Sequence, residues 1–181
     1  MLYKFDYKFD RERLLLEAKE GKYFWWGPAA HCYGNQANEE FLGWLVENPH
    51  LKKKVSKFYE NIRVHVKNAD KCPYALEIAK HVTELTGHEL WPRFYYQKKG
   101  HDLSLHTDRG IKCSINFVLT EDSDALYFEN GEEVYYTVGL LNTSERHGVY
   151  TTKDRYLFKL SFVEKTFEEI KDVLSSKLGE G

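Results

Sequence analysis

Sulfur-containing residues are scarce in this chain of 181 residues, which has three cysteines and one methionine. Cys32, Cys72 and Cys113 are odd in number, widely spaced and form no Cys-x-x-Cys pair. This pattern argues against a disulfide framework and against a thiolate zinc site. It fits a reducing compartment best, so we expect a cytoplasmic protein.

The sequence also lacks an excess of one charge and any long apolar run. Its 26 basic and 28 acidic residues give a formal net charge of -2, so nothing points to nucleic acid or an anionic membrane. No stretch approaches the ~18–20 apolar residues of a membrane span. The first residues show no basic segment followed by an apolar run, as a signal peptide would. We therefore expect no membrane partner.

The length suits one domain with a sizeable core, and we predict a single domain over residues 1–181. No repeat, linker or low-complexity tract divides the chain. Aromatic residues make up 15%, which favours strands and an aromatic-lined interior. The pattern changes near residue 90, from helical spacing before it to strand-like alternation after it.

Residues 1–90 are predicted to form a mostly helical buttress, because their apolar residues recur at helical spacing. Pro73 suits a first helical turn and Gly87 suits a helix end. A final helix is expected over 164–181, where Thr166 and Glu169 form a capping-box pair. The other predicted helices are Arg11–Lys19, Ala37–Glu47 and 51–62.

Residues 91–163 are predicted to form the β core. Cys113, Ile115 and Phe117 alternate with their neighbours as in a strand, and Asn130-Gly131 is typical of a turn. Several short strands at close spacing indicate a sandwich or barrel buttressed by helices. The predicted strands begin at Trp91 and continue at Ile111–Leu119, Ala125–Phe128, Glu133–Leu141 and Tyr156–Phe162.

The chemistry of the chain is concentrated at His106-Thr107-Asp108 and at His147, which follows Asp108 by 39 residues. Alternate residues of a strand point to one face, so His106 and Asp108 can reach one ion together. Two imidazoles and one carboxylate on one face of an octahedron leave three positions open. This is the arrangement of oxygen-activating iron(II) enzymes.

Arg155 follows His147 by 8 residues and opens an apolar run. Its guanidinium offers a planar fork that matches a carboxylate. Because such a charge is costly to bury without a partner, an inward-facing Arg155 requires an anion.

The stretch Trp91–Val163 resembles the 2-oxoglutarate- and iron(II)-dependent dioxygenases of the double-stranded β-helix fold. Within that superfamily it is similar to the small prolyl and aspartyl hydroxylase-like members of bacteria and phages. The resemblance rests on Tyr95-Tyr96, Leu103 through Asp108, Cys113 through Phe117, Asn142 through Val149, and Arg155.

The resemblance implies a jelly-roll, cupin-like core and a hydroxylase that acts on an unactivated C–H. His106, Asp108 and His147 would hold Fe(II), and Arg155 would anchor the distal carboxylate of 2-oxoglutarate. Tyr96, preferred to Tyr95 because it shares parity with His106, would assist Arg155.

Asn116, a polar residue in an apolar strand, would bind the cosubstrate from the same side. Dioxygen is the co-reactant, and ascorbate is an optional stimulant. The expected partner is a small-molecule or peptidyl substrate, on a monomer or homodimer.

Other functions remain open at this point. A non-catalytic β-sandwich protein would bind a structural metal or another ligand and would not need Arg155. A cupin-like enzyme without 2-oxoglutarate would add a further His or Glu ligand. The presence of Asp108 disfavours halogenation, and the lack of a basic cluster disfavours nucleic-acid repair. The segment Trp25–Asn35 is either packing or a lid over the site.

Overall fold

The computed structural model describes residues 1–21, 23–26, 64–108 and 110–178. Two of the predicted helices, Ala37–Glu47 and 51–62, lie outside these residues, as does most of the predicted lid Trp25–Asn35. In the described part of the chain, no helix has both the length and the apolar character needed to cross a membrane.

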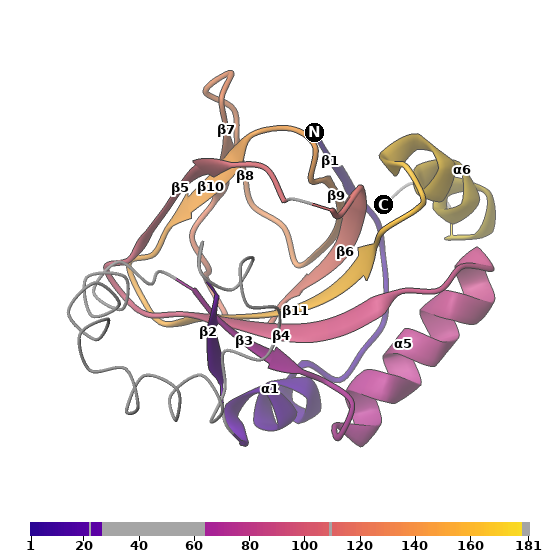
Figure 1. The fold of residues 1–181 in the computed structure, drawn as a ribbon, viewed down its shortest axis with the longest axis horizontal. Coiled ribbons are helices and arrows are strands. Elements are labelled where there is room, and N and C mark those ends of the chain that lie inside the picture. Colours follow the sequence, from indigo (N-terminus) through magenta and orange to yellow (C-terminus); the bar gives the residue numbers. More distant parts are fainter. Residues whose placement is uncertain (22, 27–63, 109, 179–181) are drawn as a thin grey trace, which may run out of the picture.

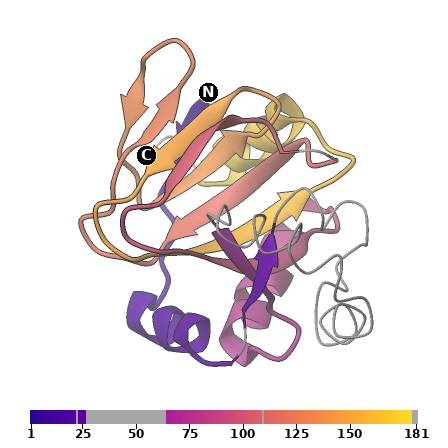
Figure 2. The ribbon, with the colours of Figure 1, turned by 60° about the vertical axis from the view of Figure 1, so that its left-hand side comes forward.

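Two antiparallel sheets face each other (Figures 1 and 2). The larger has the strand order β1-β9-β6-β11-β4-β3-β2, and the smaller has the order β5-β10-β7-β8. The strands are β1 (Leu2–Lys4), β2 (Phe24–Trp26), β3 (Val64–Asn68), β4 (Trp91–Gln97), β5 (Asp102–His106), β6 (Cys113–Val118), β7 (Leu126–Phe128), β8 (Glu133–Val134), β9 (Val138–Asn142), β10 (His147–Tyr150) and β11 (Arg155–Phe162).

The chain crosses repeatedly between the two sheets from β4 to β11. Strands β4, β6, β9 and β11 are adjacent in the larger sheet, whereas β5, β7, β8 and β10 make up the smaller one. Eight strands that alternate in this way form a jelly roll. The predicted fold class, a mainly β jelly-roll core with flanking helices, is confirmed.

Two sequence expectations need correction. The single strand predicted over Glu133–Leu141 is divided into β8 and β9, because the chain passes there from the smaller sheet to the larger one. The first half was predicted to be mostly helical, yet it also supplies three strands of the larger sheet. β1 pairs with β9, and β3 pairs with β4 and β2.

The helices end where local signals predict. Helix α1 (Arg11–Lys19) has Asp10 as its N-cap, and α5 (Pro73–Thr86) ends at Gly87, whose φ of 75° is left-handed. Helix α6 (Phe167–Leu178) begins with the predicted capping box, in which the Thr166 amide donates to Glu169 Oε2 over 2.9 Å.

The hydrophobic core lies between the larger sheet and the helices, which cover its outer face (Figure 1). On β11, Phe158, Leu160 and Phe162 point to this side and are fully buried. Full burial of one such side chain contributes roughly 1.5–3 kcal/mol. Their helical partners include Leu14 of α1, Ile78 and Val82 of α5, and Ile170 and Leu174 of α6.

The opposite face of the larger sheet is polar and looks into the jelly roll. It carries Arg155, Lys159 and Ser161 of β11 beside Ser114 and Asn116 of β6. All five side chains are buried. A separate apolar cluster of Leu126, Phe128, Leu141 and Val149 packs between the two sheets.

Candidate metal centre

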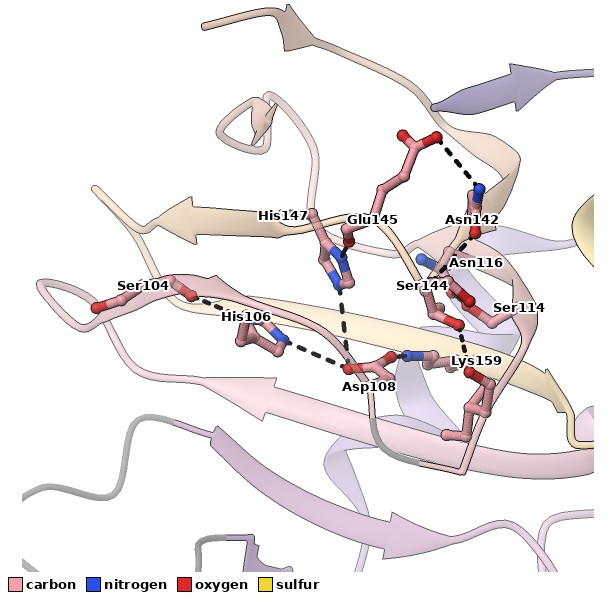
Figure 3. A network of polar contacts seen from close by, with 12 residues as sticks. Ser104, His106, Asp108, Ser114, Asn116, Asn142, Ser144, Glu145, His147 and Lys159 are labelled. Carbon is pink, nitrogen blue, oxygen red and sulfur yellow. Dashed lines mark hydrogen bonds and ion pairs between the residues drawn. The ribbon is translucent and has the colours of Figure 1, made fainter. Parts of the chain in front are cut away.

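Three potential metal ligands meet at the end of the smaller sheet (Figure 3). His106 ends β5 and is the direct cross-strand partner of His147, which begins β10. Asp108 lies two residues beyond β5, and its amide donates to the Thr143 carbonyl over 3.1 Å. One ligand atom from each of the three residues lies within 4.8 Å of the others, so the group could hold a metal ion.

Each imidazole is held in one orientation by a backbone carbonyl. Nδ1 of His106 lies 2.8 Å from the Ser104 carbonyl oxygen, and Nδ1 of His147 lies 2.8 Å from that of Glu145. A carbonyl only accepts, so Nδ1 carries the proton and donates. This leaves the Nε2 lone pairs for a metal, and they lie 3.4 Å (His106) and 4.0 Å (His147) from Asp108 Oδ1.

The surroundings of the three potential ligands shift their pKa values in different directions. Burial lowers the pKa of His147 to about 4, so at neutral pH it is the neutral imidazole that binds metals. Burial alone would raise the pKa of Asp108, but the Lys159 charge and the His106 hydrogen bond outweigh it and hold that pKa well below its usual range. Burial also disfavours His106 as a cation, yet the protonated ring can donate to both Asp108 and the Ser104 carbonyl, and this raises its pKa.

Two imidazoles, each with an Nε2 lone pair available, therefore lie close to an ionised carboxylate. This donor set fits a mononuclear transition-metal ion, for which imidazole and carboxylate are suitable ligands. His101, which a four-ligand cupin site could use, is not part of the group.

Lys159 also belongs to the site, although the sequence pattern did not predict it. Its ammonium forms an ion pair with Asp108 Oδ2, so the two oxygens of this carboxylate have different partners (Figure 3). Lys159 is 6% exposed and lies in the middle of β11. One feature of the sequence points to it. Lys159 is a single cation within the apolar run Tyr156–Phe162, and it lies an even number of residues from Arg155, so that both face the same side of the strand.

Arg155 lies on the same face of β11 as Lys159, and four residues along a strand span roughly 13 Å. Its guanidinium is buried, and its Nε donates to Ser123 Oγ over 3.2 Å. Within the described ranges no carboxylate contacts it. The structure therefore places Arg155 inside the jelly roll, away from the three ligands, with a hydroxyl as its partner.

Tyr96 does not face the metal centre. It pairs with Tyr156 on the helix-covered side of the sheet, and its hydroxyl donates to Asp154 Oδ2 over 3.1 Å. Tyr95 is the residue on the site's face, with its ring centre 5.5 Å from Lys159 Nζ. Equal parity with His106 does not place Tyr96 on the site's face, because residues 98–101 form a turn between β4 and β5 and interrupt the alternation.

Asn116 faces inward, as predicted. It is the cross-strand partner of Lys159 and is 2% exposed. Its Oδ1 accepts from Ser114 Oγ over 3.0 Å, and its Nδ2 donates to the Tyr136 hydroxyl over 3.4 Å. Its bond to a cosubstrate remains a prediction.

Comparisons with known proteins find similarity of shape only. No family model matches the chain, and no curated protein matches it. A prolyl-4-hydroxylase from Pseudomonas putida is 11% identical at a TM-score of 0.44, with 56% of this chain and 70% of that chain covered.

Two other solved structures overlap with smaller parts. A DMSP lyase structure has 14% identity and a TM-score of 0.35, and the match covers 41% of this chain and 38% of that one. Salicylate 1,2-dioxygenase from Pseudoaminobacter salicylatoxidans has 17% identity and a TM-score of 0.33, with 48% and 22% covered. This chain thus spans well under two thirds of either protein.

Proposed function

We propose that the protein is an Fe(II)- and 2-oxoglutarate-dependent oxygenase. It would hydroxylate an unactivated C–H of an amino acid, peptide or small molecule and release succinate and carbon dioxide. The observation that carries the proposal is that His106, His147 and Asp108 bring one ligand atom each to within 4.8 Å of the others in a jelly roll, with both Nε2 atoms near Asp108 Oδ1.

The number and type of ligands favour catalysis over a structural role. A structural zinc site has four protein ligands, frequently thiolates, and is closed. Here the group has three members and no cysteine among the described residues, which leaves coordination positions for exchangeable ligands. When bound, iron(II) would supply dioxygen activation at these positions.

The buried cations of β11 favour a dicarboxylate cosubstrate. Arg155 keeps its charge at any pH of interest, and its partner in the described part of the chain is a neutral hydroxyl. An anion inside the jelly roll would compensate this buried charge. We therefore retain Arg155 as the anchor of the distal carboxylate, with Asn116 and Tyr95, rather than Tyr96, on the face where the cosubstrate would lie.

The proposal is tested by anaerobic titration of Fe(II) and then 2-oxoglutarate into the metal-free protein. We expect the weak visible charge-transfer absorption of an iron-chelated 2-oxo acid. The His147→Ala variant, which lacks one ligand, serves as the matched control and should show none. If folded wild-type protein binds Fe(II) without this absorption, 2-oxoglutarate is not the cosubstrate. If it binds no metal, the non-catalytic binding protein becomes the better hypothesis.

A further inference from the structure

We propose that Lys159 is a positioning residue that restricts Asp108 to a single metal-binding oxygen. This inference rests on the proposed function, because it concerns the same metal centre. It concerns how the coordination positions needed by a cosubstrate are kept open.

The two oxygens of Asp108 have separate tasks in the structure. Oδ1 faces the Nε2 atoms of His106 and His147, at 3.4 Å and 4.0 Å. Oδ2 points the other way and forms the ion pair with Lys159 (Figure 3). The carboxylate therefore presents one oxygen to the metal position while the other is already bound.

Lys159 has little freedom to release Oδ2. Strand β11 lies inside the larger sheet between β6 and β4, so its backbone is hydrogen-bonded on both sides. Its neighbours in the pairing are Asn116 and Arg93, and its ammonium lies 5.5 Å from the centre of the Tyr95 ring. The side chain is almost fully buried, so water cannot readily replace it.

The ion pair of Lys159 with Oδ2 determines how Asp108 can coordinate a metal. A carboxylate can bind a metal through one oxygen or through both. Binding through both would occupy a position that a chelating 2-oxo acid or dioxygen needs, since three protein ligands leave three positions of an octahedron. Lys159 prevents this and so preserves the open site.

The charge of Lys159 also affects metal affinity, and this decides whether its removal should strengthen or weaken metal binding. The Lys159 ammonium lies close to the metal position and repels a divalent cation. Removal of Lys159 should therefore strengthen metal binding. Removal of a residue that only supports the fold would weaken it. The same charge would attract an anionic chelating ligand.

The decisive variant is Lys159→Met, which keeps the approximate shape and removes the charge and the donor. Co²⁺ affinity is measured by calorimetry, and 2-oxoglutarate is then added to the Co²⁺-loaded protein while the visible cobalt spectrum is recorded. We expect Co²⁺ to bind about tenfold more tightly or better, because a nearby repulsive charge is gone. We expect the 2-oxoglutarate-induced spectral change to be lost or strongly weakened, because Asp108 then occupies two positions.

Two further variants separate the causes. Lys159→Gln keeps a donor for Oδ2 without the charge, so Co²⁺ should still bind more tightly while part of the response to 2-oxoglutarate returns. It also decides the question if Lys159→Met fails to give a folded protein. Arg155→Met removes the other cation of the same strand face and should leave Co²⁺ affinity unchanged.

The inference is overturned if the folded Lys159 variants bind Co²⁺ equally or more weakly, or respond to 2-oxoglutarate as the wild type does. Wild-type protein that binds Co²⁺ and 2-oxoglutarate alongside such variants would leave the proposed function intact. Wild-type protein that binds no metal would overturn both.

Discussion

The two faces of β11 differ as much as two regions of one protein can. Phe158, Leu160 and Phe162 point to the helices and join the main hydrophobic core. Arg155 and Lys159 point into the jelly roll, and both are buried as well, at 6% exposed each. The same strand thus contributes to the hydrophobic core with one face and to the interior of the jelly roll with the other.

The free-energy cost of burying charged side chains falls on the inner face of β11. Burying a cation is unfavourable unless it is paired, and the ion pair of Lys159 with Asp108 satisfies one of the two. The apolar face compensates such costs through burial of aromatic rings, including the contact of Phe158 with Phe94 at 4.9 Å between ring centres. Mutations on the two faces should therefore affect different properties, ligand binding on the inner face and stability on the outer face.

The largest effect is expected at the candidate metal centre inside the jelly roll. His147→Ala removes one of three ligands from the metal position, and we expect metal binding to be abolished while the fold is kept. Calorimetry with Fe²⁺ or Co²⁺ and a circular-dichroism melt measure the two properties separately. Retention of wild-type metal affinity would remove His147 from the site.

The next effect belongs to the outer side. Phe158→Ala removes a fully buried ring, and we expect a loss of about 3–5 kcal/mol in the free energy of unfolding. Metal affinity of the fraction that remains folded should be unchanged, since the ring lies on the far side of the sheet. A chemical-denaturation curve gives the first quantity. If metal affinity fell in parallel, the two faces would not be independent.

Arg155→Met is expected to weaken 2-oxoglutarate binding with little effect on stability. Loss of one charge-assisted bond is worth roughly 1.5–3 kcal/mol, or about ten- to hundred-fold in affinity. Titration of 2-oxoglutarate into metal-loaded protein measures this. Tyr96→Phe is the matched control, because its hydroxyl points to Asp154 on the opposite face. An unchanged affinity in Arg155→Met would remove Arg155 from the proposed role.

The smallest effect is a pH dependence on the helix side. Hydrogen bonds from Thr166 and Lys165 hold the pKa of Glu169 at about 2, below that of a free glutamate. Its contribution to stability is therefore present above the unfolded pKa of about 4.3 and is lost as the pH falls towards 2. Glu169→Gln should flatten this part of the stability profile, as measured by thermal melts from pH 6 to pH 2. A profile parallel to that of the wild type would contradict the assignment.

The sequence alone was sufficient where the signal is local. The capping box of Thr166 and Glu169, the stop at Gly87 and the alternation of Cys113, Ile115 and Phe117 each depend on a few neighbouring residues, and the structure bears them out. The His-x-Asp motif and the later histidine predicted a common site, and the pairing of β5 with β10 places His106 and His147 side by side.

Long-range pairing decided the rest. Whether Tyr95 or Tyr96 faces the site depends on how β4 lies against β11, and a turn before β5 hides this from any count along the chain. The contact of Lys159 with Asp108 joins residues 51 positions apart, and β1 enters the sheet only because β9 offers an edge. The side-chain period of a strand is a local property that the sequence determines, whereas the face that is covered by helices and the face that encloses the metal centre are chosen when the sheets assemble.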